Sequence, residues 1–214
     1  MKQANKIAGP RQPKSPRFLY LGGRLAVDFV NTVYSPLGPD AALHDWEGLV
    51  EFLAEADVIS PERTADLLAW KKSAPQALPA LVEKALRLRR AIRSALEARI
   101  ARISLGEAVV EPINDVLRIT EGHDELVWEE GDWKLKFHAR EEAIEWLLAA
   151  IARSAAEIIA EGADAPLRKC ANPSCGLLFY DTSRTGRRRW CMMNVCGNRN
   201  KVAVFARRHS RRRH

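Results

Sequence analysis

Four cysteines constrain the fold of this chain more than any other feature, because all of them lie within its last quarter in two pairs of equal spacing. Both pairs follow the pattern C-x4-C, and the 214 residues contain no other cysteine. A structural zinc site uses four ligands in a tetrahedron, with thiolate sulfurs at about 2.3 Å from the metal, and short chelating pairs usually supply them. The spacing therefore predicts one structural Zn²⁺ held by Cys170, Cys175, Cys191 and Cys196.

The alternative for these cysteines is a pair of disulfides, for which four thiols allow three connectivities. Disulfides need an oxidising compartment. Residues 1–10 lack the apolar segment of a signal peptide, and no run of about 18 apolar residues occurs that could span a membrane. A redox role is disfavoured because the C-x-x-C motif is absent. We therefore expect a cytoplasmic protein with zinc-bound thiolates and no membrane association.

The charge of the chain is divided unevenly. Residues 168–214 contain thirteen lysines and arginines and a single acid, a net charge of +12. The other 167 residues contain 21 basic and 26 acidic residues, a net charge of −5. A short basic module on a mildly acidic body is typical of nucleic-acid binding, because phosphate contacts supply most non-specific affinity. The alternative is that these arginines only form a solvated surface, but the adjacent zinc site favours polyanion binding.

Arginine can reach phosphates or the edges of guanine bases, so the basic residues of this module are candidate DNA contacts. Arg199 and its neighbour Asn198 could equally brace the zinc site through hydrogen bonds. The arginines at positions 211–213 are expected to contact phosphates and to carry little sequence information. The candidate contacts are Arg187, Arg188, Arg189, Arg199, Lys201, Arg207, Arg208 and Arg211.

The remainder of the chain predicts a mainly α-helical fold with a minor β-hairpin. Helices are expected over 45–54, from residue 61, over 78–103, over 107–120 and over 143–159. Asp45 and Ser60 are N-cap candidates, and Gly162 is a stop signal. Apolar and polar residues alternate in 125–128 and in 133–137, and the sequence Glu-Glu-Gly-Asp separates the two runs. This pattern predicts the hairpin. The basic face of the 78–103 helix is expected to meet water.

Two polar residues, Asp28 and Asn31, interrupt an apolar run over 25–33 that could be helix or strand. Buried polar groups need partners, so these side chains either brace a neighbouring element or line a ligand pocket. We favour the brace. The ligand pocket stays open because a body about three times larger than the zinc finger suits either a sensor or a dimerisation domain.

These patterns divide the chain into three parts: a disordered basic leader over 1–17, a helical regulatory domain over 18–162, and a zinc finger with a basic C-terminal helix over 167–214. Residues 176–180 and 187–191 are expected to form two strand-like runs that pair as a hairpin around a turn. A helix should follow the second cysteine pair. The finger is thus expected to be treble-clef-like, with the metal supplying its folding energy.

The sequence from Trp190 to Lys201, which contains Cys-Gly-Asn-Arg, resembles the CGNR zinc-finger family. The preceding cysteine pair and Phe179-Tyr-Asp-Thr-Ser-Arg184 support the resemblance, and the run Leu-Ala-Val-Asp-Phe-Val-Asn-Thr from residue 25 resembles the domain that normally precedes that finger. The resemblance covers about residues 18–208. It implies a bacterial cytoplasmic regulator of transcription, proposed to respond to stress, with zinc on the four cysteines.

We therefore expect a DNA-binding transcription regulator and not an enzyme, since no catalytic motif was found. Two other functions stay open: a zinc-dependent module that docks an acidic protein partner, and RNA binding. A homodimer and a small-molecule or stress-signal ligand are further expectations.

Overall fold

The computed structural model describes residues 16–34, 42–73, 75–119, 122–129, 132–139 and 144–210. The predicted leader up to residue 15, and the arginines at 211–213, lie outside this part of the chain. Arg17, which the sequence assigned to the leader, is instead held by the body. Its backbone N–H donates to Glu55 (2.9 Å) and its guanidinium to Glu51 (2.8 Å).

Six helices form the body in the described residues, and several begin where the sequence predicts. Asp45 caps its helix by accepting a hydrogen bond from the Gly48 N–H (2.7 Å), and the Ser60 hydroxyl accepts from the Arg63 N–H (3.2 Å). The ambiguous run over 25–33 is a helix. The helices are α1 (Leu25–Asn31), α2 (Trp46–Glu55), α3 (Pro61–Ser73), α4 (Leu78–Ile100), α5 (Glu107–Ile119) and α6 (Ala149–Ala160).

Two predicted helix boundaries were wrong: the C-terminal end of α4 and the N-terminal start of α6. Helix α4 ends at Ile100, and Ile103 is 62% exposed instead of continuing the buried stripe. Arg102 has a left-handed backbone (φ 56°), which is incompatible with further helix. The helix expected over 143–159 begins as a 3-10 turn at Ile144–Leu148 and becomes α-helical only at Ala149.

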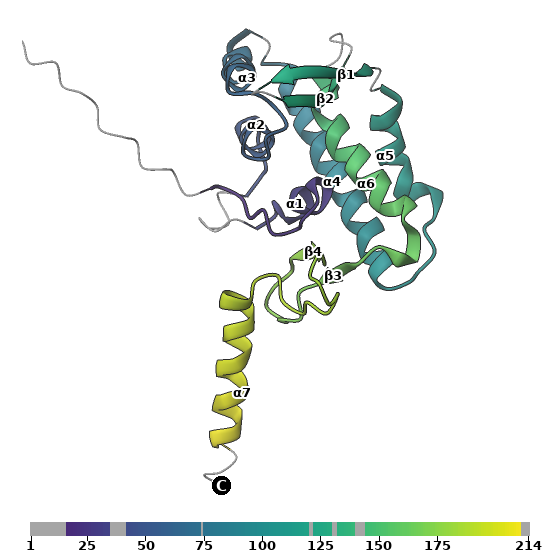
Figure 1. Cartoon of the computed structure of the whole chain (residues 1–214). Helices are drawn as coiled ribbons and strands as arrows, with labels where there is room; N and C mark the ends of the chain where they lie inside the picture. Colours follow the sequence, from purple (N-terminus) through teal and green to yellow (C-terminus); the bar gives the residue numbers. More distant parts are fainter. Residues whose placement is uncertain are drawn as a thin grey trace, which may run out of the picture.

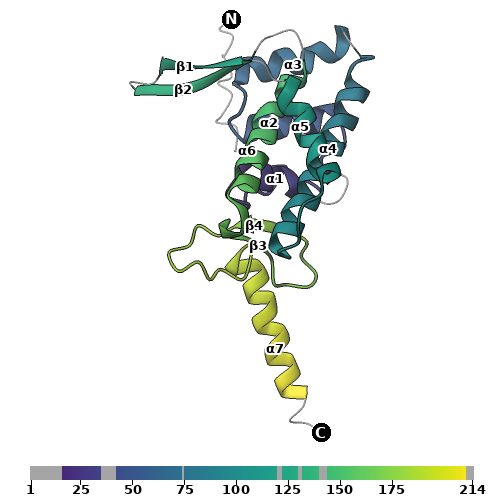
Figure 2. The same ribbon diagram turned by 90° about the vertical axis from the view of Figure 1, so that its right-hand side faces the viewer.

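The predicted hairpin is present as β1 (Gly122–Glu129) and β2 (Asp132–Ala139), which pair antiparallel with Trp128 opposite Trp133. It lies at the end of the helical body that is remote from the C-terminal segment (Figures 1 and 2).

The C-terminal segment contains a second two-stranded sheet, formed by β3 (Leu167–Lys169) and β4 (Leu178–Tyr180). The expected pairing of 176–180 with 187–191 was wrong, because β4 pairs with residues that precede the first cysteine. Helix α7 (Asn198–Ser210) follows the second cysteine pair as predicted and projects away from the body (Figures 1 and 2).

One hydrophobic core joins the helical body to the C-terminal segment. It is built from α1, α2, α4 and α6, and it also contains Leu167 of β3 and Leu178 of β4. A second, smaller cluster surrounds the cysteines and receives Leu19 and Leu21 from the N-terminal side of α1. Each part therefore contributes apolar side chains to the core of the other.

The basic face of α4 does more than meet water. Arg89 donates to the Leu43 carbonyl (2.8 Å), Arg93 to the Gly176 carbonyl (3.1 Å) and Arg99 to the Ile159 carbonyl (2.9 Å). Burial lowers the pKa of Arg89 to about 10. These arginines tie α4 to its neighbours, so the prediction of a solvated face was wrong for them.

None of the helices in the described parts of the chain has the length and apolar character that crossing a bilayer requires.

Candidate metal centre and nucleic-acid interface

The four cysteines, two between β3 and β4 and two before α7 in the chain, meet at one point. Their sulfur atoms all lie within 4.8 Å of one another, with Cys191 at 3.7 Å from both Cys175 and Cys196. A tetrahedron with metal–sulfur bonds of about 2.3 Å has sulfur–sulfur edges of about 3.8 Å. A disulfide would need about 2.05 Å. The four cysteines are therefore positioned to bind one zinc ion.

Hydrogen bonds from the protein are directed at these sulfurs. The Asn172 amide donates to the Cys196 sulfur (3.4 Å), and the Cys191 N–H donates to the Cys170 sulfur (3.5 Å). Burial raises the pKa of Cys175 to about 11 and that of Cys191 well above its usual range. Without a cation the thiols of Cys175 and Cys191 thus keep their protons at neutral pH, and zinc binding releases those protons.

The loop between the cysteine pairs is organised by one buried carboxylate, Asp181, whose side chain is 0% exposed. One oxygen accepts from the Arg168 side chain (3.0 Å) and the Arg188 N–H (2.9 Å), and the other accepts from Ser183. Burial alone would raise the pKa of Asp181, but the donors of Ser183 and Arg188, together with the charge of Arg168, outweigh it and hold the pKa below its usual range.

Two glycines of the cysteine loops leave room for large neighbours. A Cβ at Gly176 would clash with the ring and hydroxyl of Tyr34, just after α1. A Cβ at Gly197 would collide with the Met193 sulfur and come within 3.3 Å of Trp190. A side chain at either position would displace the end of the Tyr34 or Met193 side chain, and at Gly176 this contact is the one with the helical body.

Asn31 of α1 holds strand β4 by two hydrogen bonds to one residue. Its amide nitrogen donates to the Leu178 carbonyl (2.8 Å), and its oxygen accepts from the Leu178 N–H (3.0 Å). The buried side chain thus satisfies both backbone groups of Leu178, as a neighbouring strand would. We call this pair of hydrogen bonds the α1–β4 clamp.

Asp28 supports the same strand indirectly. It accepts from the Gly22 N–H (2.6 Å), and the Gly22 carbonyl accepts from the Tyr180 N–H of β4 (2.6 Å). Burial raises the pKa of Asp28 to about 6, against the lowering effect of the backbone N–H groups of Gly22 and Leu21. The contacts of Asp28 and Asn31 favour the bracing interpretation, and a ligand pocket beside them stays a prediction.

Two family models match the chain. The model described as "Putative stress-induced transcription regulator" matches residues 23–162, which is more than half of the chain, and the CGNR zinc finger matches residues 167–209. The chain belongs to this regulator family. No curated protein shows significant similarity to it. The predicted resemblance is thus confirmed, and the C-terminal segment is a CGNR zinc finger with the four-cysteine cluster at its centre.

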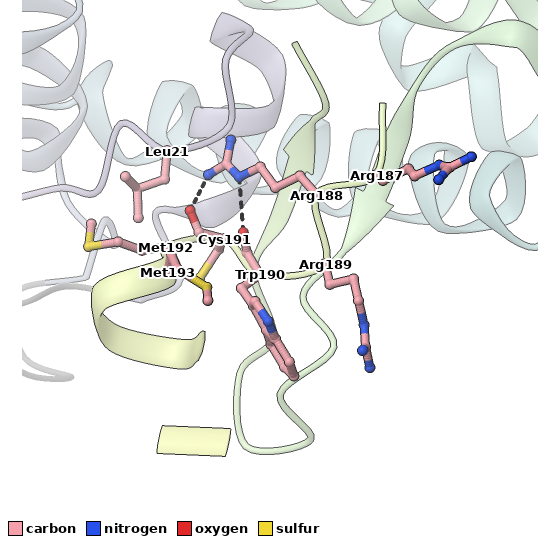
Figure 3. Close-up of a pocket in the computed structure, with 8 residues that line it drawn as sticks. All are labelled: Leu21, Arg187, Arg188, Arg189, Trp190, Cys191, Met192 and Met193. Carbon is pink, nitrogen blue, oxygen red and sulfur yellow. Dashed lines mark hydrogen bonds between the residues drawn. The ribbon is translucent and has the colours of Figure 1, made fainter. Parts of the chain in front are cut away.

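The structure separates the candidate DNA contacts of the CGNR finger into two kinds. Arg187, Arg189, Arg199 and Lys201 are exposed. Arg188 instead donates to the carbonyls of Trp190 and Cys191 (Figure 3). Its guanidinium carbon also lies 4.5 Å from the centre of the Phe179 ring. Arg188 therefore braces the second cysteine pair, and a DNA contact at this residue stays a prediction.

The other candidates lie on or beyond α7. Arg207 and Arg208 fall within this helix, and Arg211 follows it outside the described residues. The bracing alternative for Asn198 has some support, because its amide donates to the Asn194 carbonyl (3.0 Å). Arg199 is exposed, which favours its availability to a partner.

Sequence reasoning missed Asp181 and the roles of Leu19 and Leu21. The Asp-x-Ser pattern at 181–183 is a recognisable signal for a side chain that bonds its own backbone two residues later. The packing of Leu19 and Leu21 against the cysteine cluster has no local signal, because the partners are about 150 residues away in the chain.

Proposed function

We propose that this protein is a DNA-binding transcription regulator in which the CGNR finger contacts DNA and the helical body is the regulatory part. One observation carries the proposal. The single carboxylate of the finger, Asp181, is buried, whereas Arg187, Arg189 and Arg199 are exposed. The outward surface of the finger therefore carries cations without compensating acids, which is the arrangement that phosphate binding requires.

The shape of α7 supports the same proposal. Its 13 residues span about 20 Å at 1.5 Å per residue, and it projects from the finger away from the body (Figure 1). The major groove of B-DNA admits an α-helix. Arg199 and Lys201 suit phosphates or guanine edges, and the exposed Val202 suits the methyl group of thymine.

The test is the salt dependence of DNA affinity for the full-length, zinc-loaded protein. The logarithm of the binding constant should fall linearly with the logarithm of salt concentration, by about 0.9 per neutralised phosphate. Replacing Arg187 and Arg189 together by alanine should reduce the magnitude of the slope by about 2. Arg118→Ala is the matched control, since Arg118 is an exposed arginine on α5 that pairs with Glu111.

Absence of binding at low salt would contradict the proposal. Deletion of the finger is a poor test, because β3 and β4 belong to the core of the body. RNA of the same sequence is the comparison that separates DNA from RNA binding. Selection of bound genomic fragments would then identify an operator.

A second candidate function is docking of an acidic protein partner. It is favoured by the apolar surface of α7, where Val202 is 68% and Phe205 is 62% exposed beside basic residues. An acidic amphipathic segment would complement such a helix. Affinity for protein that persists while DNA binding is absent would favour this function.

The regulatory role of the body, a homodimer and a small-molecule effector are parts of the proposal that need their own tests. A ligand that binds only the folded protein raises its stability, so a thermal-shift screen of metabolites addresses the effector directly. Location in the bacterial cytoplasm, at the nucleoid, follows from the proposal only if DNA is bound.

A further inference from the structure

The CGNR finger contains an open pocket of about 510 Å³ beside its second cysteine pair. Its wall is apolar and is formed by Trp190, Met192 and Met193 of the finger and by Leu21 of the segment before α1, and Arg187, Arg188 and Arg189 complete its lining with Cys191 (Figure 3). The pocket therefore combines a flat aromatic ring with three cations, and none of its lining residues is acidic.

Trp190 is held in position by its neighbours. Its ring packs near Gly197, where a side chain could not fit without crowding it. The guanidinium carbon of Arg189 lies 5.2 Å from the centre of the Trp190 ring. In Figure 3 the Arg189 side chain runs beside the indole of Trp190. The half-buried Trp190 ring thus lies under an exposed cation.

We propose that this pocket takes an unpaired nucleotide of the bound DNA, with the base against Trp190 and a phosphate at Arg189. This inference rests on the proposed function and narrows the kind of DNA recognised. Stacking of a base on an aromatic side chain contributes about 1–3 kcal/mol and tolerates any sequence. The thioethers of Met192 and Met193 suit the edge of an aromatic base.

Charge decides between a nucleotide and an apolar side chain of a protein partner. An apolar side chain would use the wall of the pocket and leave Arg187 and Arg189 without a counter-charge. A nucleotide supplies both an aromatic ring and an anion, so it complements the wall and the cations together.

The experiment compares two DNA probes by fluorescence anisotropy at one salt concentration: a blunt duplex, and the same duplex with a short single-stranded tail. The full-length, zinc-loaded protein should bind the tailed probe about tenfold more tightly, as expected for one stacked base. Trp190→Leu should abolish this preference and leave the affinity for the blunt duplex within about twofold. Trp190→Phe should retain most of it.

A second pair of variants covers the case in which Trp190→Leu loses zinc. Met193 lines the pocket and is 53% exposed, whereas Val195 is 40% exposed and lies outside the pocket lining. Met193→Glu and Val195→Glu each add one negative charge to the same turn. Only Met193→Glu should remove the preference for the tailed probe.

The outcomes separate the two proposals. Equal binding of both probes by the unaltered protein, or an unchanged preference in Met193→Glu, overturns the nucleotide pocket and leaves DNA binding intact. In that case an apolar side chain of a protein partner becomes the better occupant. Failure to bind either probe at low salt overturns the proposed function itself.

Discussion

Buried carboxylates in this protein have opposite electrostatic character because their donors differ. Asp181 receives hydrogen bonds from Ser183, Arg188 and a charged Arg168, and its pKa is lowered. Asp28 has only backbone N–H donors, and burial raises its pKa to about 6 against their lowering effect. The first carboxylate stabilises the finger as an anion. The second carboxylate, Asp28, destabilises the fold when it is ionised, so its effect on stability depends on pH.

Asp28 should therefore make stability fall as the pH rises. Its folded pKa of about 6 lies above the value of 3.8 expected for an exposed carboxyl, so its contribution is complete below about pH 4 and is lost as the pH rises through 6. Between pH 5.5 and 8, with zinc in excess throughout, the free energy of unfolding should fall by about 1 kcal/mol more in the wild type than in Asp28→Asn. Urea unfolding at several pH values measures this difference. A constant difference between the two proteins would show that Asp28 does not titrate in this range.

Elements with local partners were predictable from the sequence, and elements with remote partners were not. The N-cap residues Asp45 and Ser60 predict where α2 and α3 begin, and a short turn between β1 and β2 predicts their pairing. Strands β3 and β4 have only three residues each. The sequence of residues 178–180 does not indicate whether the strand that pairs with them comes earlier or later in the chain. The four cysteines were predictable because ligand chemistry fixes their spacing. Asn31 was recognisable as a buried polar residue, but its partner Leu178 lies 147 residues away.

The α1–β4 clamp offers a test at the level of these two elements. Asn31→Asp keeps the size of the side chain but sets a carboxylate oxygen against the Leu178 carbonyl, where an amide now donates. The loss of a buried hydrogen bond and the burial of a charge should lower the free energy of unfolding by about 3 kcal/mol. Chemical unfolding measures the change, and zinc release to a chelator should become faster.

Asn198→Asp is the matched control for this substitution. The Asn198 amide donates to the Asn194 carbonyl on the surface of the finger, and the residue is exposed. Its replacement should alter the free energy of unfolding by no more than about 0.5 kcal/mol. If both substitutions lowered the free energy of unfolding equally, the clamp would contribute no more to stability than an exposed hydrogen bond.

Across the whole molecule, the boundary between the two matched families does not coincide with a boundary in packing. Leu167 and Leu178 of the finger lie in the core of the body, and Leu19 and Leu21 pack against the cysteine cluster. Ionic contacts follow the same interface, since Lys169 of β3 pairs with Glu97 of α4 (3.3 Å). We therefore expect the finger and the body to unfold together.

Removal of zinc should accordingly destabilise the helical body. A metal that binds only the folded protein adds its binding free energy to the stability of every part that unfolds with it. Chelation should lower the melting temperature of the helical circular-dichroism signal by more than about 10 °C, because several kcal/mol are lost in a chain of this size. Re-addition of zinc should restore it. Two separate transitions, with the main helical one insensitive to the chelator, would show that the finger unfolds alone.

The clamp also limits how this finger can be exchanged between proteins. A chimaera that attached residues 167–210 to a different helical scaffold would keep all four cysteines. It would lose both hydrogen bonds that the Asn31 side chain makes to the Leu178 backbone. The space left at Gly176 for Tyr34 would be empty as well. A successful graft would have to carry residues 19–34 with it, so the smallest transferable unit is discontinuous in the gene.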